Sequence, residues 1–261
     1  MPAGYAHLDF GDEVLKTLPD SIKDIIQNNI ELYHIGVHGP DILFYHNALK
    51  SNPVSRLGFE MHNLEAYDFF YKAKEIINQS FDHDASLAYI LGFVTHFTLD
   101  SECHGYIGKM QKELNMTHSE LESEFDRQLL VNKGFNPLTT SLTSHIHPSH
   151  DKSKIIAPFF GLKDVDIDRS LKDLLFFLKM LLAPGKIKRT FILQVMKMAG
   201  IYEEYKGLMI NYEKNSKSEK AIDELIVLKK NAVHVAYDLI INYIDFLDGG
   251  ELKERFRRTY E

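Results

Sequence analysis

The 261-residue chain contains no tryptophan and a single cysteine, Cys103. One cysteine excludes an internal disulfide framework and a cysteine-rich metal site, and it favours a reducing compartment. Basic residues are not in excess either, since 37 Asp and Glu face 30 Lys and Arg, for a net charge of -7. This balance argues against general electrostatic binding of nucleic acid, which needs a basic face. Any anionic ligand must therefore find positive charge locally.

Segments that would insert the chain into a membrane are also missing from the sequence. The N-terminus does not combine a basic region with a following apolar stretch, so it does not read as a secretory signal. The most apolar stretch, residues 174–183, is interrupted by Lys179 and is shorter than the ~20 residues needed to span a bilayer. We therefore expect a cytoplasmic protein with no transmembrane segment. Peripheral contact with a membrane stays open.

Apolar residues recur mostly at intervals of three and four, which is typical of amphipathic helices. We therefore expect an all-α protein built as a single multi-helix bundle. Asp82 or Asp84 can cap the fourth helix and Thr117 the fifth, and the glycine pair 249–250 can end the eighth. The expected helices are residues 12–16, 20–37, 56–79, 85–104, 118–131, 166–182, 190–209 and 218–247, with a short tail helix after Gly250.

Residues 134–158 are rich in Ser, Thr, Pro and His, and this composition predicts a long loop. We nevertheless expect one domain over residues 1–261, because neither half has an obvious core of its own. Helix bundles also often carry one long connection. Within this domain, a metal-binding part would occupy about residues 1–133, and a helical C-terminal part about residues 158–261.

Histidine is the residue type that stands out, with thirteen copies, eleven of them before residue 150. It is the commonest metal ligand in proteins. His96, Asp100 and His104 are spaced four and four apart, so a helix places them on one face, about 6 Å apart along its axis. His118 and Glu122 repeat the spacing, and a nitrogen and a carboxylate one turn apart can bind the same ion.

Chance accounts for single pairs but not for the ladder of three. With thirteen histidines and 37 acids, about 1.8 pairs of the form His-x3-Asp/Glu are expected at random, and the chain has four. A ladder such as His96-Asp100-His104 is expected only about 0.1 times per chain by the same arithmetic. The ladder is therefore the informative feature, and it predicts a metal site.

Further candidates lie upstream of the ladder. Asp41 follows a Gly-Pro pair, where a helix does not readily continue, and histidines flank it. His7 and His62 complete the set, although a histidine taken alone is more often a core or surface residue than a ligand, by about two to one. We favour His62 as the partner of Asp41, because it opens a long helix, and His46 stays open as the alternative.

The order and spacing of these residues resemble the zinc-dependent phospholipase C family, in particular its short, leaderless bacterial branch. The resemblance covers about residues 5–130, and its strongest part is the Leu-Gly-x3-His-x3-Asp segment from Leu91 to Asp100, followed by a later His-x3-Glu. It implies a single helical bundle of the phospholipase C/P1 nuclease type with a cluster of three zinc ions. The implied ligands are Asp41, His62, His96 and Asp100 for one ion; His104, His118 and Glu122 for a second; His7 and a bridging Asp100 for a third.

The chain departs from the family at the third ion. In secreted members that ion is also held by an N-terminal tryptophan, whereas this chain has no tryptophan and begins Met1-Pro2. The spacing from Asp100 to His104 is also shorter than in those enzymes. We therefore expect two or three zinc ions.

A zinc cluster lowers the pKa of bound water to about 7 and neutralises phosphate oxygens, so it can hydrolyse a phosphoester without a side-chain nucleophile. The metal also supplies the positive charge that this acidic chain needs to bind an anion. Asp41 can double as the general base. We therefore expect a zinc-dependent phosphoric diester hydrolase, phospholipase C-like, whose partner is a phosphoester such as a phospholipid head group.

Alternative hypotheses come from other classes. A nuclease or nucleotidase would share the fold, and the His83-Asp84 dipeptide is found in HD-type phosphohydrolases. Glu31-x-x-His34 resembles half of a carboxylate di-iron site, which needs two such motifs. A non-catalytic module stapled by metal is the remaining alternative, and it would have four protein ligands at each ion and no open position.

Overall fold

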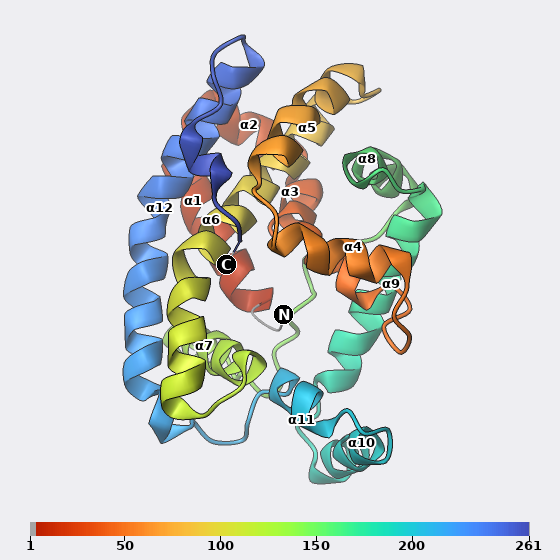
Figure 1. The fold of residues 1–261 in the computed structure, drawn as a ribbon, viewed down its shortest axis with the longest axis vertical. Coiled ribbons are helices and arrows are strands. Elements are labelled where there is room, and N and C mark those ends of the chain that lie inside the picture. Colours follow the sequence, from red (N-terminus) through yellow and green to blue (C-terminus); the bar gives the residue numbers. More distant parts are fainter. Residues whose placement is uncertain (1–3, 261) are drawn as a thin grey trace.

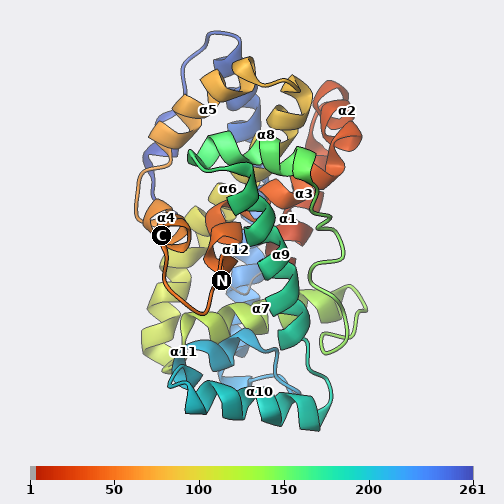
Figure 2. The ribbon, with the colours of Figure 1, turned by 90° about the vertical axis from the view of Figure 1, so that its right-hand side faces the viewer.

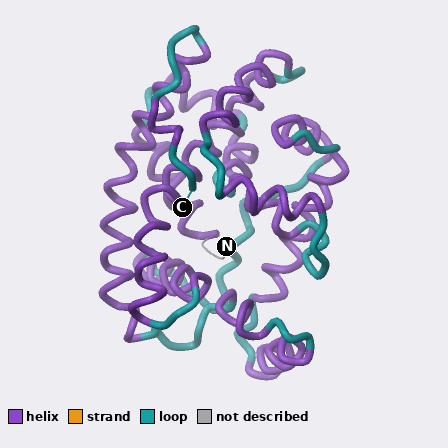
Figure 3. Tube along the Cα trace, viewed as in Figure 1, coloured by secondary structure: helices purple, strands orange, loops and turns teal. Residues whose placement is uncertain are grey.

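The computed structural model describes residues 4–260, apart from the side chain of Glu204, and over this range it contains helices and no strand (Figure 3). The predicted all-α class is therefore confirmed. The α-helices are α1 (Gly4–Thr17), α2 (Asp20–Asn28), α3 (Ile30–Gly36), α4 (Pro53–His62), α5 (Tyr67–Gln79), α6 (His83–Leu114), α7 (His118–Asn132), α8 (His150–Phe160), α9 (Asp164–Leu181), α10 (Lys186–Met198), α11 (Tyr202–Tyr205) and α12 (Glu219–Leu247). Short 3-10 helices are η1 (Gly39–Tyr45), η2 (Lys206–Leu208), η3 (Ser216–Ser218) and η4 (Glu254–Arg257).

Helix α6 is the longest element and runs through the bundle, packed against α1, α3 and α12 (Figures 1 and 2). All of its residues from Ala85 to Asp100 are buried. A helix that is buried on every side must be apolar on every side, and the few polar residues it carries need a structural or chemical reason. His96 and Asp100 lie within this buried stretch.

Two glycines allow α3 to approach α6 at backbone distance. A Cβ added at Gly36 would lie 2.1 Å from the carbonyl oxygen of Tyr89, and one added at Gly92 would lie 2.2 Å from that of Tyr33. Any larger residue at either position would push the helices apart. The chain leaving α3, which contains Asp41, is thereby held against the middle of α6.

The hydrophobic core is divided unequally. The main core includes residues from Ala6 to Tyr260, so the two ends of the described chain pack into the same interior. A smaller core lies under α10, which occupies one end of the molecule in both views (Figures 1 and 2), and comprises Leu181, Ala183, Ile192, Met196 and Met209.

Several expected helix ends agree with the structure, because the capping residues that define them can be recognised in the sequence. The side chain of Asp82 accepts a hydrogen bond from the amide of Ala85 at the start of α6. Thr117 and Glu120 form a capping box at the start of α7, and Gly249, with φ +106°, follows the end of α12.

Other boundaries were wrong. The expected helix 20–37 breaks at Asn29, and the expected helix 190–209 ends at Met198. The expected helix 56–79 ends at His62, because residues 63–66 bind the C-terminal tail: Ala66 donates to the carbonyl of Arg258, and Tyr260 to that of His62. His62 therefore closes a helix and does not open one.

The predicted loop 134–158 also needs correction, because its last part forms α8. Ser149 caps this helix by accepting from the amide of Lys152, and Ile155, Ile156 and Phe159 are buried. Pro158 is accommodated two residues before the end of the helix. Burial of this apolar face outweighs the local cost of the proline.

Candidate metal centre

Asp100 lies at the centre of a cluster of histidines on and around α6. Its Oδ2 lies 2.9 Å from Nε2 of His96, one turn earlier on α6, and its Oδ1 lies 3.3 Å from Nε2 of His104, one turn later. The predicted ladder therefore shares one face of α6. Both Asp100 and His96 are almost completely buried.

The inner group consists of Asp41, His62 and His96, whose ligand atoms all lie within 4.8 Å of one another. Oδ1 of Asp41 is 3.0 Å from Nε2 of His62, and Oδ2 is 4.0 Å from Nδ1 of His96. Nδ1 of His62 lies 2.8 Å from the carbonyl oxygen of Gly58, so Nδ1 carries a proton and Nε2 is the nitrogen that faces Asp41.

Gly39 explains how Asp41 reaches this position. Its backbone has φ +50°, and a Cβ at this residue would lie 2.2 Å from the His96 ring. Only glycine allows the turn to pass so close to the ring in this conformation. The Gly-Pro-Asp sequence is thus a tight 3-10 turn over His96 that presents the carboxylate of Asp41.

The outer group consists of His104, His118 and Glu122, which also satisfy the 4.8 Å limit. Oε1 of Glu122 lies 3.2 Å from Nε2 of His118 and 3.6 Å from Nε2 of His104. The Thr117 cap fixes the first turn of α7 and hence the position of His118. With a side chain 35% exposed, His118 is the most accessible of the candidate ligands, so the centre opens to solvent at this group.

The third group contains His7, which joins His96 and Asp100. Nε2 of His7 lies 3.2 Å from Oδ1 of Asp100, and its ring stacks on that of His96 at 4.4 Å. The buried carboxylate of Asp126 holds the start of α1 by accepting from the amides of Tyr5 and Ala6. Met1 and Pro2, which stand where secreted members of the resembled family carry the tryptophan, lie outside the described residues.

The residues fit a cluster of zinc ions. Ligands of a tetrahedral zinc at 2.0 to 2.1 Å stand about 3.3 Å apart, and the closest contacts within the three groups are 2.9 to 3.2 Å. Although some of these atoms lie 2.9 or 3.0 Å from one another, several form no well-aligned hydrogen bond within the described residues: Oδ1 of Asp41, both nitrogens of His96, Oδ2 of Asp100 and Oε2 of Glu122. Such atoms are costly to bury unless a cation binds them.

Electrostatics keeps the carboxylates ionised, as metal ligands must be. Burial raises the pKa of Asp100, but His104, His96 and His7 outweigh it and hold the pKa well below its usual range. The same opposition, with His118 as the main partner, holds the pKa of Glu122 well below its usual range. Burial lowers the pKa of His96 and so favours its neutral, metal-binding form.

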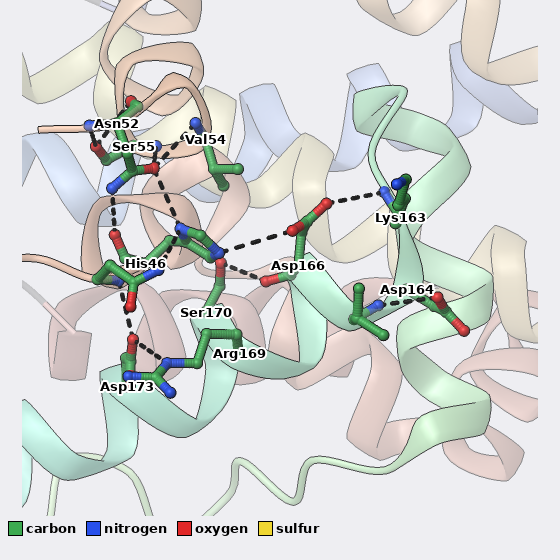
Figure 4. A network of polar contacts seen from close by, with 12 residues as sticks. His46, Asn52, Val54, Ser55, Lys163, Asp164, Asp166, Arg169, Ser170 and Asp173 are labelled. Atoms are coloured by element: carbon green, nitrogen blue, oxygen red, sulfur yellow. Dashed lines mark hydrogen bonds and ion pairs between the residues drawn. The ribbon is translucent and has the colours of Figure 1, made fainter.

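His46, the alternative partner of Asp41, belongs to another network, shown in Figure 4. Its Nδ1 lies 3.1 Å from the side-chain oxygen of Asn52, and its Nε2 lies 3.8 Å from Oδ1 of Asp166. Asn52 also caps α4 by accepting from the amides of Val54 and Ser55. His46 thus ties the loop before α4 to α9, and the structure brings His62 to Asp41 instead.

The motifs of the alternative hypotheses do not belong to any of the three ligand groups. His83 and Asp84 are exposed at the start of α6, thirteen residues before His96, or about 20 Å along the axis. Glu31 pairs with Lys152, and His34 with Asp12.

Tyr260 is a residue of the centre that the sequence did not reveal. Its ring lies 5.2 Å from that of His62 and 5.9 Å from that of His96, and the residue is 1% exposed. It belongs to no motif and is more than 150 residues from either histidine. Its packing arises only because the tail docks on residues 62–66.

Comparison with protein families matches residues 6–166, more than half of the chain, to the family described as zinc-dependent phospholipase C. The match extends beyond the expected limit near residue 130 and ends in the first turn of α9. Comparisons with curated proteins and with solved structures gave no match. No helix in the described part of the chain is long and apolar enough to cross a membrane. The residues of the centre and the extent of this match lead to one conclusion: the chain belongs to the zinc-dependent phospholipase C family.

Proposed function

We propose that the chain is a phosphoric diester hydrolase of the phospholipase C type whose centre holds two or three zinc ions. Family membership supports a zinc-dependent phosphoester hydrolase as the general class. The observation that carries the finer proposal is that Asp100 lies within 3.7 Å of a histidine from each of the three ligand groups. Among the described residues, several buried nitrogens and oxygens of these groups also lack a well-aligned hydrogen bond.

The ligand assignment follows the three groups. The inner group with Asp100 would hold one ion, the outer group a second, and His7 with Asp100 a third. The outer group and the His7 group each offer fewer than four protein ligands. A structural zinc is closed by four protein ligands, whereas a catalytic one keeps an open position. The ligand count therefore favours catalysis at the outer and His7 groups, whereas the inner group with Asp100 has the four ligands of a closed site.

Zinc, when bound, supplies an acidified water and neutralises phosphate oxygens. The chain contributes the carboxylate of Asp41, whose pKa is raised by burial but lowered overall by His96 and His62, so that it is ionised, as a metal ligand or a general base must be. Cys103 is no competing nucleophile, because burial raises the pKa of its thiol to about 12. Substrate would enter at His118, the exposed side of the centre.

Hydrolysis of p-nitrophenyl phosphorylcholine by the purified, zinc-replete protein tests this proposal. We expect chelator-sensitive turnover that Asp41→Asn lowers at least about a hundredfold, the lower bound for loss of a general base. Zinc content measured on the same variant separates the two roles of Asp41: retained zinc with lost turnover indicates a base, and lost zinc indicates a ligand.

His83→Ala is the matched control, since it removes an exposed histidine of the same helix, and it should leave rate and zinc content unchanged. Nucleotides and short oligonucleotides form the second arm of the assay. Full zinc occupancy without turnover on choline diesters, phospholipids or nucleotides would refute the enzyme proposal and support the metal-stapled module.

A further inference from the structure

Helix α10 presents an apolar stripe to solvent. Ile187 is 90% exposed, Phe191 66% and Met198 81%. These positions, together with Val195, follow the i, i+4, i+8, i+11 spacing that places side chains on one face of a helix. A different face of α10, with Ile192 and Met196, packs into the smaller core. The helix is therefore apolar on its inner side and again on its outer side.

Lysines border the exposed stripe. At 100° per residue, Lys186 and Lys197 lie on one side of the stripe. Lys188 lies on the other side, where its ammonium donates to the carbonyls of Lys179 and Leu182. From residue 174 to 202 the chain has five Lys and Arg and no Asp or Glu, although its net charge is -7. An exposed apolar stripe edged by lysines is the pattern of a helix that lies in a membrane interface and binds anionic lipid.

A neighbouring cavity has the same apolar character. It measures about 460 Å³ and lies between loop 137–143, the second half of α9, Arg189 of α10 and residues 208–210. Seven of its fourteen lining residues are leucines. Such walls suit an acyl chain and are unsuited to a sugar-phosphate backbone.

The α10 end of the molecule is tied to the helix that carries the outer group. Arg189 donates to the carbonyl of Ile210, and Arg127 of α7 donates to those of Asn211 and Tyr212. Ser123 of α7 also bonds to the carbonyl of Gly207. The segment 207–212 thus joins α10 to α7, on which His118 is the exposed ligand.

Other occupants fit these observations less well. A second copy of the chain packed stripe to stripe would bring the lysines of one α10 against those of the other, and like charges repel. A nucleic acid would use the lysines but would leave the aliphatic residues of the stripe in water.

We propose that α10 is an interfacial docking helix, which inserts its exposed stripe among the head groups of a bilayer that contains anionic phospholipid. The docked bilayer lies against the end of the molecule where segment 207–212 joins α10 to α7. Docking would also bring phosphodiester head groups toward the metal centre, and this part of the proposal rests on the proposed function. The docking itself does not depend on that function, and α10 lies outside the matched region 6–166.

Co-sedimentation of the full chain with vesicles tests the docking. We expect binding to vesicles of equal parts phosphatidylcholine and phosphatidylglycerol, and much weaker binding to phosphatidylcholine alone or at high salt. Phe191→Ser should lower the partition coefficient about tenfold. The double change Lys186→Gln and Lys197→Gln should lower it about 25-fold, or fivefold for each lysine.

Controls match these changes in chemistry but not in position. Phe81→Ser removes an equally exposed phenylalanine (71%) that lies next to Asp82 and Asp84. Lys220→Gln with Lys230→Gln removes two exposed lysines of α12. Both controls should bind vesicles as the unmodified chain does, and circular dichroism should be the same for all variants.

The outcomes separate this proposal from the proposed function. Turnover of the soluble diester with no binding to anionic vesicles overturns the docking alone. Vesicle binding with no turnover on any substrate supports the docking and refutes the enzyme. A dimer that Phe191→Ser dissociates, or DNA binding that the lysine changes abolish and Phe191→Ser does not affect, would overturn the docking in favour of another partner.

Discussion

The inner and outer groups of the centre use the same ligand types but are built differently. The inner group draws its residues from η1, α4 and α6, and each of them is buried. The outer group draws on α6 and α7, and both of its histidines are partly exposed, His118 more than His104. Depth therefore distinguishes a ligand group closed in by the packing of the fold from one that reaches solvent, and Asp100 lies between the two groups.

The strongest perturbation should be Asp100→Asn, because this residue contacts ligands of all three groups. A neutral amide cannot supply the negative charge that the carboxylate presents to the surrounding histidines, and breaking such a buried pair costs about 3–5 kcal/mol. We expect only the zinc of the outer group, whose three assigned ligands do not include Asp100, to be retained, and the free energy of unfolding to drop by about 3–5 kcal/mol. Elemental analysis and denaturant unfolding measure the two effects, and zinc retained in full would show that Asp100 is not a zinc ligand.

Gly39→Ala should disrupt zinc binding by the inner group without affecting the outer group. The added Cβ clashes with the His96 ring in a backbone conformation that alanine adopts poorly, and we expect a loss of about 2–4 kcal/mol in stability. Zinc should be lost from the inner group and kept by the outer group. Gly105→Ala is the control, since a Cβ there meets nothing within 4 Å. Equal zinc content in the two variants would contradict the packing account.

Chelator kinetics should distinguish the two groups in the unmodified protein. The outer ion would be reached past the partly exposed His118, so it should leave first, in a faster phase than the inner ion, because the shell around a site controls solvent access. His118→Ala should remove the fast phase only. Zinc release followed with a chromogenic chelator measures both phases. A single phase that His118→Ala leaves unchanged would contradict a difference in accessibility between the two groups.

Tyr260 should give the smallest effect. Tyr260→Phe keeps the ring that packs on His62 and His96 and deletes a buried hydroxyl that has no hydrogen-bond partner in the described part of the chain. We expect a gain in stability of up to about 1 kcal/mol and unchanged zinc binding. Tyr260→Ala should cost about 3–5 kcal/mol by comparison. Thermal unfolding measures both, and lost turnover in Tyr260→Phe would instead indicate that the hydroxyl contacts substrate.

The same contrast explains what the sequence could predict. The ladder on α6 and the pair on α7 depend on helical spacing alone, so local pattern was sufficient to bring each set onto one face. Thr117 and Asp82 were legible as caps for the same reason. These features need no knowledge of distant parts of the chain.

Features that depend on tertiary contact were missed or misplaced. His62 was expected to open a helix, but the tail residues 258–260 bind the chain just after it and end the helix there. The α8 segment was read as a loop, because its proline and serines masked an apolar face that only the core reveals. The proposals for a single domain and for the individual ligands stay predictions that these contacts motivate.

The zinc content of the purified, metal-replete protein tests the central claim most directly. Two ligand groups at different depths, joined by Asp100, predict at least two equivalents of zinc per chain by elemental analysis. Less than one equivalent of any transition metal would contradict the account.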